Sequence, residues 1–125
     1  MVTNRNPEGS FLLACRALVV IATEPSAVIS SERVADCIGA HPVVLRRVLG
    51  RLRSEGLVEG RSGPGGGWAI ARDPHDIGLG RIRRALKPAI GSEGDRLART
   101  LRTAEDAFAR ELDRVSIGDV MRDPA

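Results

Sequence analysis

The sequence predicts a mainly α-helical fold that contains one small β-hairpin. Three observations lead to this prediction. Apolar residues recur at helical spacing over most of the chain. Two strand-like segments flank the glycine-rich stretch RSGPGGG at 61–67. A long segment near the C-terminus carries one narrow apolar stripe, which is typical of helices that pair with a partner. Together they predict a winged helix-turn-helix followed by a long C-terminal dimerisation helix.

Length and composition indicate one domain with a helical extension. The chain has 125 residues, of which 42% are hydrophobic and 2% aromatic, so the core must be built from aliphatic side chains. The expected division is a winged helix-turn-helix unit over 1–86 and a dimerisation helix with a short last helix over 87–125. A chain this short that also carries a function often shares its core with a second copy.

The first two helices are marked by their caps. Residues 10–23 are apolar around most of a helical wheel and predict a buried helix with Ser10 as its N-cap. A second helix is expected to begin at Ser31, as the N-cap, and to stop at Gly39.

A third helix is predicted over 42–54, because Pro42 stands at a first-turn position where its missing N–H costs nothing. Its apolar residues repeat at helical spacing, and its other face carries Arg46, Arg47, Gly50, Arg51 and Arg53. A hairpin follows, with strands at 57–61 and 68–71.

The remaining segments predict three more helices. Residues 77–86 form one, 94–115 form a long one, and Ser116 caps a short last helix. The long helix has its apolar stripe at Leu97, Leu101, Ala104, Phe108, Leu112 and Val115. Because such a narrow seam needs a partner surface, a homodimer is expected through Leu97, Leu101, Ala104, Phe108 and Leu112.

Charge suggests what the basic helix binds. The net charge is +3, and 41–72 carries six arginines against two glutamates. The apolar face of 42–54 would anchor it to the preceding helices, which leaves its arginine face available for a DNA major groove. The free N–H groups at Ser31 suit a phosphate. The alternative is a winged-helix protein–protein interaction module that uses its arginine face on an acidic partner.

The glycine-rich loop does not read as a nucleotide-binding loop. Such a loop lies between a strand and a helix and ends in Gly-Lys-Ser/Thr. Here the loop lies between two strand-like segments, and Lys87 is the only lysine in the chain. As the tip of a wing, Gly65 and Gly66 would let the backbone approach DNA closely; the alternative is that they serve only the turn.

The run LRRVLGRLRSEGLVEGRSGPGGGWAIARDPHDIGLGRI at 45–82 resembles the Rrf2 family of bacterial winged-helix regulators. The similarity extends over essentially the whole chain. It implies a homodimeric transcription factor, usually a repressor, on a palindromic operator. The residues expected to contact double-stranded DNA, from the resemblance and the pattern together, are Ser31, His41, Val43, Arg46, Arg47, Arg51, Arg61, Ser62, Gly65 and Gly66.

The sequence departs from the family pattern at two positions, which limits the DNA contacts that can be assigned by resemblance. Some members have an acidic base-reading residue where this chain has Arg46, so its operator should differ. The family's wing arginine falls at Ser62, with Arg61 one place earlier, so which of the two enters the minor groove stays open.

The sensor segment also departs from the family. Iron–sulfur members place three cysteines between the fourth helix and the long helix, and the matching KPAIGSEGDRLARTL at 87–101 has none. No cofactor is therefore expected. Cys15 and Cys37 are either small core residues or redox thiols. The signal would be a thiol change, a small molecule or a partner protein.

No enzyme is predicted. His41 and His75, the two histidines, have no nucleophile and acidic partner at motif spacing, and no metal-ligand pair occurs. No apolar run approaches the length that spans a bilayer, and two cysteines do not indicate a disulfide framework. We expect a cytoplasmic protein that does not enter membranes.

Overall fold

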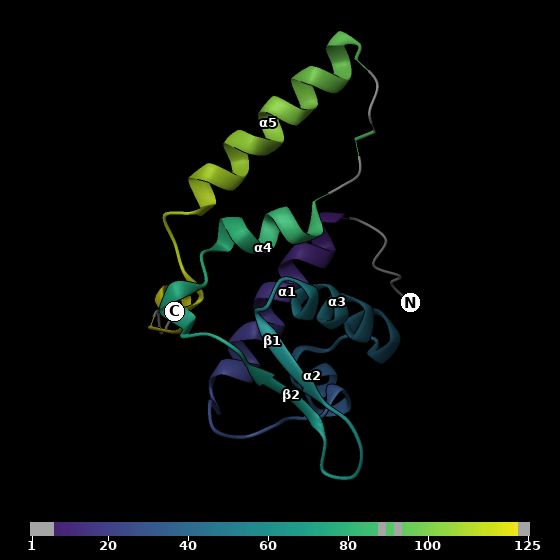
Figure 1. Ribbon diagram of the computed structural model, residues 1–125, viewed down its shortest axis with the longest axis vertical. Helices are drawn as coiled ribbons and strands as arrows, with labels where there is room; N and C mark the ends of the chain where they lie inside the picture. Colours follow the sequence, from purple (N-terminus) through teal and green to yellow (C-terminus); the bar gives the residue numbers. More distant parts are fainter. Residues whose placement is uncertain (1–6, 88–89, 92–93, 123–125) are drawn as a thin grey trace.

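The computed structural model describes residues 7–87, 90–91 and 94–122 (Figure 1). Its elements in chain order are α1 (Pro7–Ala22), α2 (Ser31–Ile38), α3 (Pro42–Ser54), β1 (Val58–Arg61), β2 (Gly67–Ile70), the 3-10 turn η1 (Pro74–Asp76), α4 (Leu79–Leu86), α5 (Arg96–Leu112) and α6 (Ile117–Arg122). The predicted mainly α-helical fold with one hairpin is confirmed, and α3 has the predicted bounds.

Two predicted caps were wrong. Helix α1 already includes Pro7, so Ser10 lies inside it. The N-cap of α2 is Ser30, whose backbone is extended and whose side-chain oxygen accepts the N–H of Arg33 at 3.2 Å. Ser31 is instead the first residue of α2 and is buried. Both serines have the chemistry of a cap, and only the backbone conformation decides between them.

The later helices are shorter than predicted. Helix α4 begins two residues late because Ile77 and Gly78 are extended: the carbonyl of Ile77 accepts the N–H of Ile117 at 2.8 Å, and Gly78 is bridged to Ser116. Helix α5 begins after Asp95, whose Oδ1 accepts the N–H of Ala98 at 2.8 Å. It ends at Leu112, so Val115 lies outside the helix.

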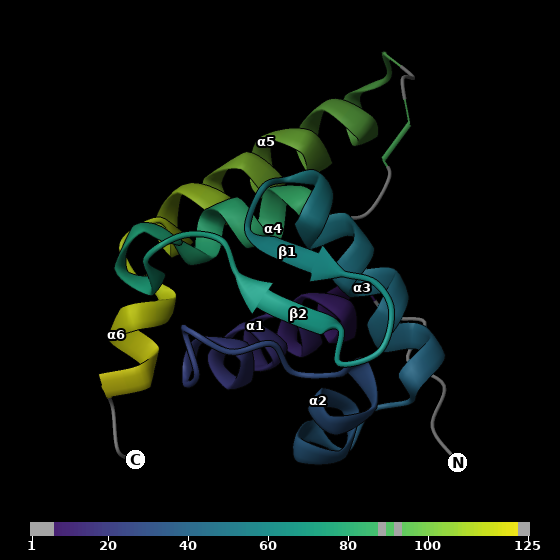
Figure 2. The same cartoon turned by 60° about the horizontal axis from the view of Figure 1, so that its bottom comes forward.

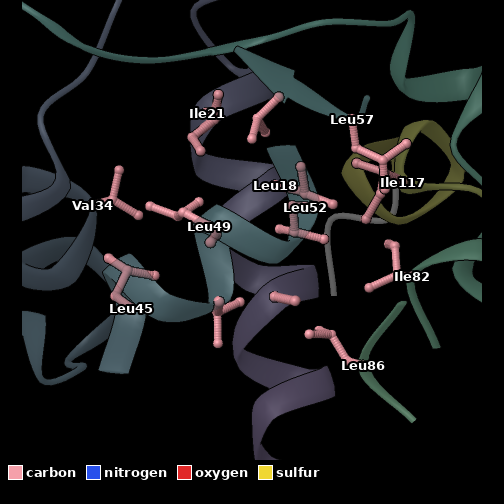
Figure 3. Close-up of a cluster of buried hydrophobic side chains, with 14 of the residues drawn as sticks. Leu18, Ile21, Val34, Leu45, Leu49, Leu52, Leu57, Ile82, Leu86 and Ile117 are labelled. Carbon is pink, nitrogen blue, oxygen red and sulfur yellow. The ribbon is translucent and has the colours of Figure 1, made fainter. Parts of the chain in front are cut away.

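The core lies where α1 meets α3, α4, α6 and the hairpin (Figure 3). Leu18 and Ile21 of α1 are completely buried, and Ile117 of α6 reaches the same cluster. The further buried side chains are almost all aliphatic: Val34, Leu45, Leu49, Leu52, Leu57, Val58, Ile77 and Ile82. This agrees with the scarcity of aromatic residues in the sequence.

The hairpin is joined to the segment before α2. Strands β1 and β2 pair antiparallel, with Gly60 opposite Trp68. Ile29 exchanges both backbone hydrogen bonds with Trp68, at 2.9 and 2.8 Å. These bonds connect the tip end of the hairpin, rather than its base, to the segment before α2. Figure 2 shows α2 beside the hairpin, on the side away from α5.

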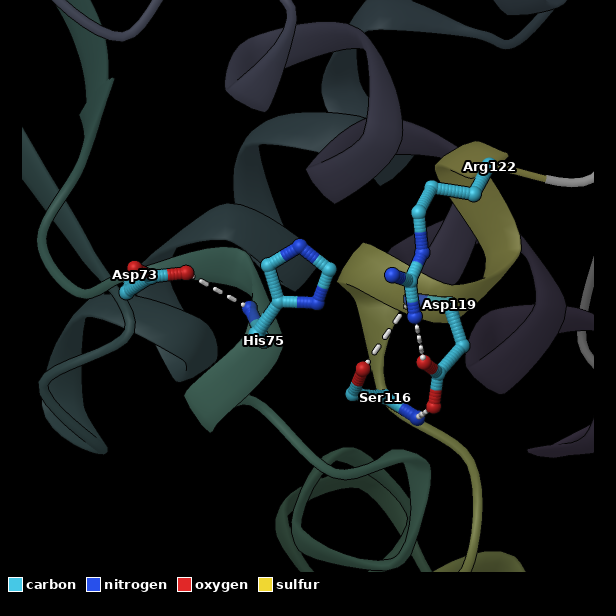
Figure 4. A network of polar contacts seen from close by, with 5 residues as sticks. All are labelled: Asp73, His75, Ser116, Asp119 and Arg122. Carbon is cyan, nitrogen blue, oxygen red and sulfur yellow. Dashed lines mark hydrogen bonds and ion pairs between the residues drawn. The ribbon is translucent and has the colours of Figure 1, made fainter.

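Helix α6 docks against η1 through a close contact (Figure 4). Ser116 caps it as predicted, because its Oγ accepts the N–H of Asp119 at 3.0 Å while Asp119 Oδ2 accepts the N–H of Ser116 at 2.9 Å. These Ser116 bonds, with Arg122, lower the pKa of Asp119. A Cβ on Gly118 would come 2.3 Å from Nδ1 of His75, so this approach requires glycine.

Helix α5 lies along α4, and its N-terminal end extends away from the hairpin (Figure 1). Arg83 of α4 is 3% exposed and binds Glu105 of α5 through two hydrogen bonds of 2.7 and 2.9 Å. Its guanidinium lies 5.7 Å from the ring centre of Phe11 and 4.8 Å from that of Phe108. One buried arginine thus connects α1, α4 and α5.

Candidate nucleic-acid interface

The outer face of α3 presents the residues expected to contact bases. The opposite face is buried in the core through Leu45, Val48, Leu49 and Leu52. Because a helix can bury only one face in this way, Arg46 and Arg47 point outward, and both are exposed. Val43, one turn before Arg47, is 48% exposed. An exposed valine beside two arginines suits a thymine methyl group next to guanine edges.

His41 fixes the start of α3. Its Nδ1 accepts a hydrogen bond from the backbone N–H of Val43 at 3.2 Å, and Pro42 fills the first helical position. His41 is therefore the N-cap of α3, and its side chain is also exposed. The cap sets the direction in which the arginine face leaves the protein surface.

Arg46 is also linked to α2. Its Nη1 lies 3.6 Å from Oε2 of Glu32, and the two side chains are 50% and 68% exposed. An exposed ion pair of this kind contributes at most about 1 kcal/mol. Arg46 can therefore leave Glu32 for another acceptor at little cost.

A cavity of about 270 Å³ lies between the start of α2 and the hairpin. Four of the predicted DNA-binding residues line it: Ser31, Arg61, Ser62 and Gly66. Ser30, Ser31 and Glu32 at the start of α2 therefore line the same space as Arg61 of the wing, although they are far apart in sequence. Backbone N–H groups together with a guanidinium suit a DNA phosphate.

The glycines of the wing tip each have a structural reason. Gly63 and Gly65 have φ of +85° and +74°, values that residues with a Cβ rarely adopt. At Gly66 a Cβ would come 2.2 Å from the carbonyl oxygen of Arg61. Turn geometry and packing thus account for these three positions. At Gly65 a Cβ would meet nothing within 4 Å, so the outer side of the tip is open.

Arg53 was placed on the free face of the third helix but was not among the residues expected to contact DNA, yet it lines the same cavity. Its guanidinium lies 6.0 Å from the ring centre of Trp68, which stiffens an otherwise mobile side chain. The available signal was its spacing: Arg53 follows Arg46 by seven residues and so shares its face of α3.

Arg51 lies elsewhere. Its Nη1 donates to the carbonyl oxygen of Ala85 at 3.1 Å, which places the guanidinium beside the end of α4. Arg72 likewise donates to the carbonyl of Gly56 at 3.2 Å, and Arg81 to that of Glu55 at 3.0 Å. The six arginines of 41–72 therefore fall into two groups. Arg51 and Arg72 bind backbone carbonyls, while the others lie on the outer surface of α3 and the wing.

The apolar stripe of α5 is exposed in the single chain. Leu97 is 67% exposed, Leu101 46% and Phe108 39%; Ala104 is also exposed, and Leu112 is half-buried. A groove of about 550 Å³ runs beside them along Thr100, Thr103, Ala104 and Ala107. The neighbouring face of α5 is covered, because Ala98 and Ala109, each one residue after a member of the stripe, are buried.

The two thiols differ in accessibility. Cys15 of α1 is half-buried, and burial raises the pKa of its thiol to about 12. Cys37 of α2 is exposed, so its interpretation as a small core residue was wrong. A thiolate is the reactive form of cysteine, and Cys15 stays protonated at neutral pH.

Alkylation is therefore expected to be selective. With iodoacetamide at mildly alkaline pH the folded protein should gain one label, at Cys37, and Cys15 should react only after unfolding in guanidinium. Peptide mass spectrometry locates the label, and a Cys37→Ser variant should remain unlabelled while folded. Equal labelling of both residues would contradict the burial of Cys15.

An exposed basic helix beside a glycine-tipped hairpin defines the class: a winged helix-turn-helix protein of the DNA-binding type. The model of the Rrf2 family, described as iron-dependent transcriptional regulator, matches residues 9–123. The transcriptional repressor NsrR of Streptomyces coelicolor is 30% identical over 129 residues, spanning 90% of this chain and 85% of NsrR. The chain belongs to the Rrf2 family of transcriptional regulators, and the resemblance seen in the sequence is confirmed.

Solved structures show the same fold. IscR of T. potens superposes with a TM-score of 0.73 at 22% identity, over 100% of this chain and 88% of IscR. CymR, described as the global cysteine regulator of B. subtilis, gives a TM-score of 0.70 at 21% identity, over 97% of each chain. The predicted winged helix-turn-helix with a long C-terminal helix is thereby confirmed as the architecture.

The residues present do not fit the iron that the family description names. Within 7–87, 90–91 and 94–122, no group of three or more His, Cys, Asp or Glu side chains could hold a metal ion. Iron–sulfur clusters are held mostly by cysteine thiolates. The chain has two cysteines, on different helices, and one is a half-buried thiol with a raised pKa.

None of the helices in the described part of the chain is long and apolar enough to cross a membrane.

Proposed function

We propose that the protein is a homodimeric repressor that binds a palindromic operator through α3 and the wing. The observation that carries this proposal is that the N-terminus of α2, Arg53 of α3 and Arg61 of the wing line one cavity, and that α3 also carries the exposed Arg46 and Arg47. A phosphate in that cavity would fix the duplex against the protein while the start of α3 enters the major groove.

The contacts divide by type. Arg46 and Arg47 read guanine edges, and Val43 meets a thymine methyl group. His41, Ser31 and the wing residues position the backbone of the duplex. Of the two wing candidates, which both line the cavity beside the α2 N-terminus, we assign phosphate contact to Arg61, because its guanidinium carries a positive charge. We assign no DNA contact to Arg51, because its guanidinium is held at Ala85.

The dimer is proposed to form through α5. Leu97, Leu101, Ala104, Phe108 and Leu112 face the partner's copy, which removes an otherwise exposed apolar stripe from water. A two-fold axis through this helix would present two α3 helices to half-sites about one helical turn apart, or a multiple of it. The rest of the chain, from α1 to α4, forms the DNA-binding unit.

We further propose that the protein works without an iron–sulfur cluster. Purified without oxygen, it should be colourless and should contain no stoichiometric iron or acid-labile sulfide. This proposal is supported by the two cysteines, which are too few in one chain to hold such a cluster by thiolates alone. Visible absorption with about one cluster per dimer would overturn this, because clusters can also form between chains.

Operator binding tests the recognition helix. An Arg46→Ala, Arg47→Ala double variant should bind the DNA upstream of the protein's own gene more weakly, by about 1–3 kcal/mol for each bidentate pairing with guanine that it removes. Fluorescence anisotropy measures the affinity. An Arg110→Ala, Arg114→Ala double variant removes the same charge from the end of α5 and the turn after it, and should retain full binding.

Arg61→Ala tests the wing separately, because a phosphate contact acts through counterion release and does not depend on the DNA sequence. It should weaken binding to all sequences alike and reduce the slope of log K against log salt by about 1. Unchanged operator binding by the Arg46, Arg47 double variant would refute the assignment of α3. Binding of an acidic protein in place of any DNA would support the interaction-module alternative.

A further inference from the structure

A second basic groove lies away from the wing, at the junction of α3, α4 and α5. Its volume is about 510 Å³, within the range of about 300–1,000 Å³ that small-molecule sites occupy. Arg51 of α3 lies on one side, Arg84 and Lys87 at the end of α4, and Arg102 on α5. Helix α4 lies between α5 and the DNA-binding helices in both views of the chain (Figures 1 and 2).

Positive charge is in excess in this groove. Its lining has four cationic side chains and two carboxylates, Glu105 and Asp106. Glu105 is already bound by Arg83 from the protein interior, and this bond lowers its pKa, so it stays ionised and satisfied. Arg84 is bound by Asp113 at 2.8 and 3.0 Å.

Two of the cations form no ion pair within the residues that the structure describes. These are Arg51, which donates only to the Ala85 carbonyl there, and Lys87. Arg102 donates to the carbonyl of Gly91 at 2.9 Å. Because Arg51 binds one carbonyl there, its guanidinium keeps further N–H donors for another acceptor, and the Lys87 ammonium has three.

We propose that this groove binds a small polyanion, a molecule with two or more carboxylate or phosphate groups. Lys87 and Arg51 would each bind one anionic group. A single monovalent ion would satisfy only one of these positions. The groove is therefore matched to a ligand whose charges are separated by a short carbon or phosphate skeleton.

Such a ligand would couple to DNA, and this part of the proposal rests on the proposed function. Arg51 belongs to α3, which reads the operator, and Arg102 belongs to α5, which joins the dimer. A molecule held between them biases the placement of α3 relative to α5, because it binds only one arrangement of the two helices well.

Isothermal titration calorimetry on the full-length protein, without DNA, tests the site. Citrate and pyrophosphate are the probes for the carboxylate and phosphate classes, each titrated at constant ionic strength against a chloride control. We expect saturable binding of at least one probe at one molecule per chain. Lys87→Gln should weaken it about tenfold, since hydrogen bonds to charged groups are among the stronger ones. Arg61→Ala, at the wing, should leave it unchanged.

The outcomes separate the site from the proposed function. Absence of saturable binding, equal binding by Lys87→Gln, or loss of binding in Arg61→Ala would each overturn the site. Calorimetry involves no DNA, so failure of operator binding does not affect this result. Operator affinity that responds to the bound probe in the native protein, and not in Lys87→Gln, supports the coupling; an unchanged affinity at saturating probe overturns it.

Discussion

A Leu97→Asp, Leu101→Asp double variant is expected to be monomeric and to bind the operator at least about a hundredfold more weakly, because two linked half-site contacts become one. Both leucines are exposed in the single chain, at 67% and 46%, so aspartate costs the monomer little. In the proposed dimer the same positions are buried, and four unpaired carboxylates would oppose association.

Phe108 is less suited to this test, although it belongs to the same stripe. The centre of its ring lies 6.4 Å from the centre of the Phe11 ring, so a charge there would also disturb the single chain. Val120→Asp on α6, at a residue that is 40% exposed, is the matched control and should remain dimeric. Light scattering measures the mass, and anisotropy compares a full operator with a half-site. A double variant that stays dimeric would exclude α5 as the interface.

Replacement of Glu105 by alanine is expected to lower the free energy of unfolding by about 2–3 kcal/mol. Arg83 and Glu105 are 4% and 11% exposed in their side chains, and the variant removes two hydrogen bonds to a charged group there. Glu111→Ala, which removes a 3.7 Å ion pair between side chains 71% and 77% exposed, should cost at most about 0.5 kcal/mol. Urea unfolding measures both.

The pH dependence gives this prediction a second readout. Arg83 lowers the pKa of Glu105 in the folded protein, so the carboxylate stabilises the fold fully above the ordinary glutamate pKa of about 4.3. This stability is lost as the pH falls through the lowered value. The native protein should therefore lose more stability between neutral and acidic pH than Glu105→Ala. Parallel pH profiles for the two proteins would contradict the role of the pair.

Local signals predicted the fold well, and distant contacts explain what they missed. Pro42 and the Glu55–Gly56 turn defined α3 because they act on their own backbone. The start of α4 was misplaced because Ile77 and Gly78 are held extended by Ile117 and Ser116, residues about forty positions further along the chain. The choice of Ser30 over Ser31 depended on a backbone angle that neither side chain reveals.

The site shows the same limit. Periodicity placed Arg46, Arg47, Arg51 and Arg53 on the free surface of α3, but it gave no way to sort them. Arg51 donates a hydrogen bond to a carbonyl 34 residues away, and the guanidinium of Arg53 lies over the ring of Trp68 in the wing. The Arg83–Glu105 pair, 22 residues apart, was likewise invisible to helical spacing. Side chains of one type differ in role when their partners come from other elements.

The attachment of α5 to the rest of the chain has a mechanical consequence. The helix has 17 residues, which at about 1.5 Å per residue makes an arm about 25 Å long. Glu105, which Arg83 binds, lies about 14 Å from the N-terminal end of the helix, so a turn of about 15° about this contact displaces that end by about 3.5 Å, close to the roughly 3.4 Å step between base pairs. If the dimer forms through α5 as proposed, a rotation of this size beside Arg83 would shift each α3 helix by about one base pair along the DNA.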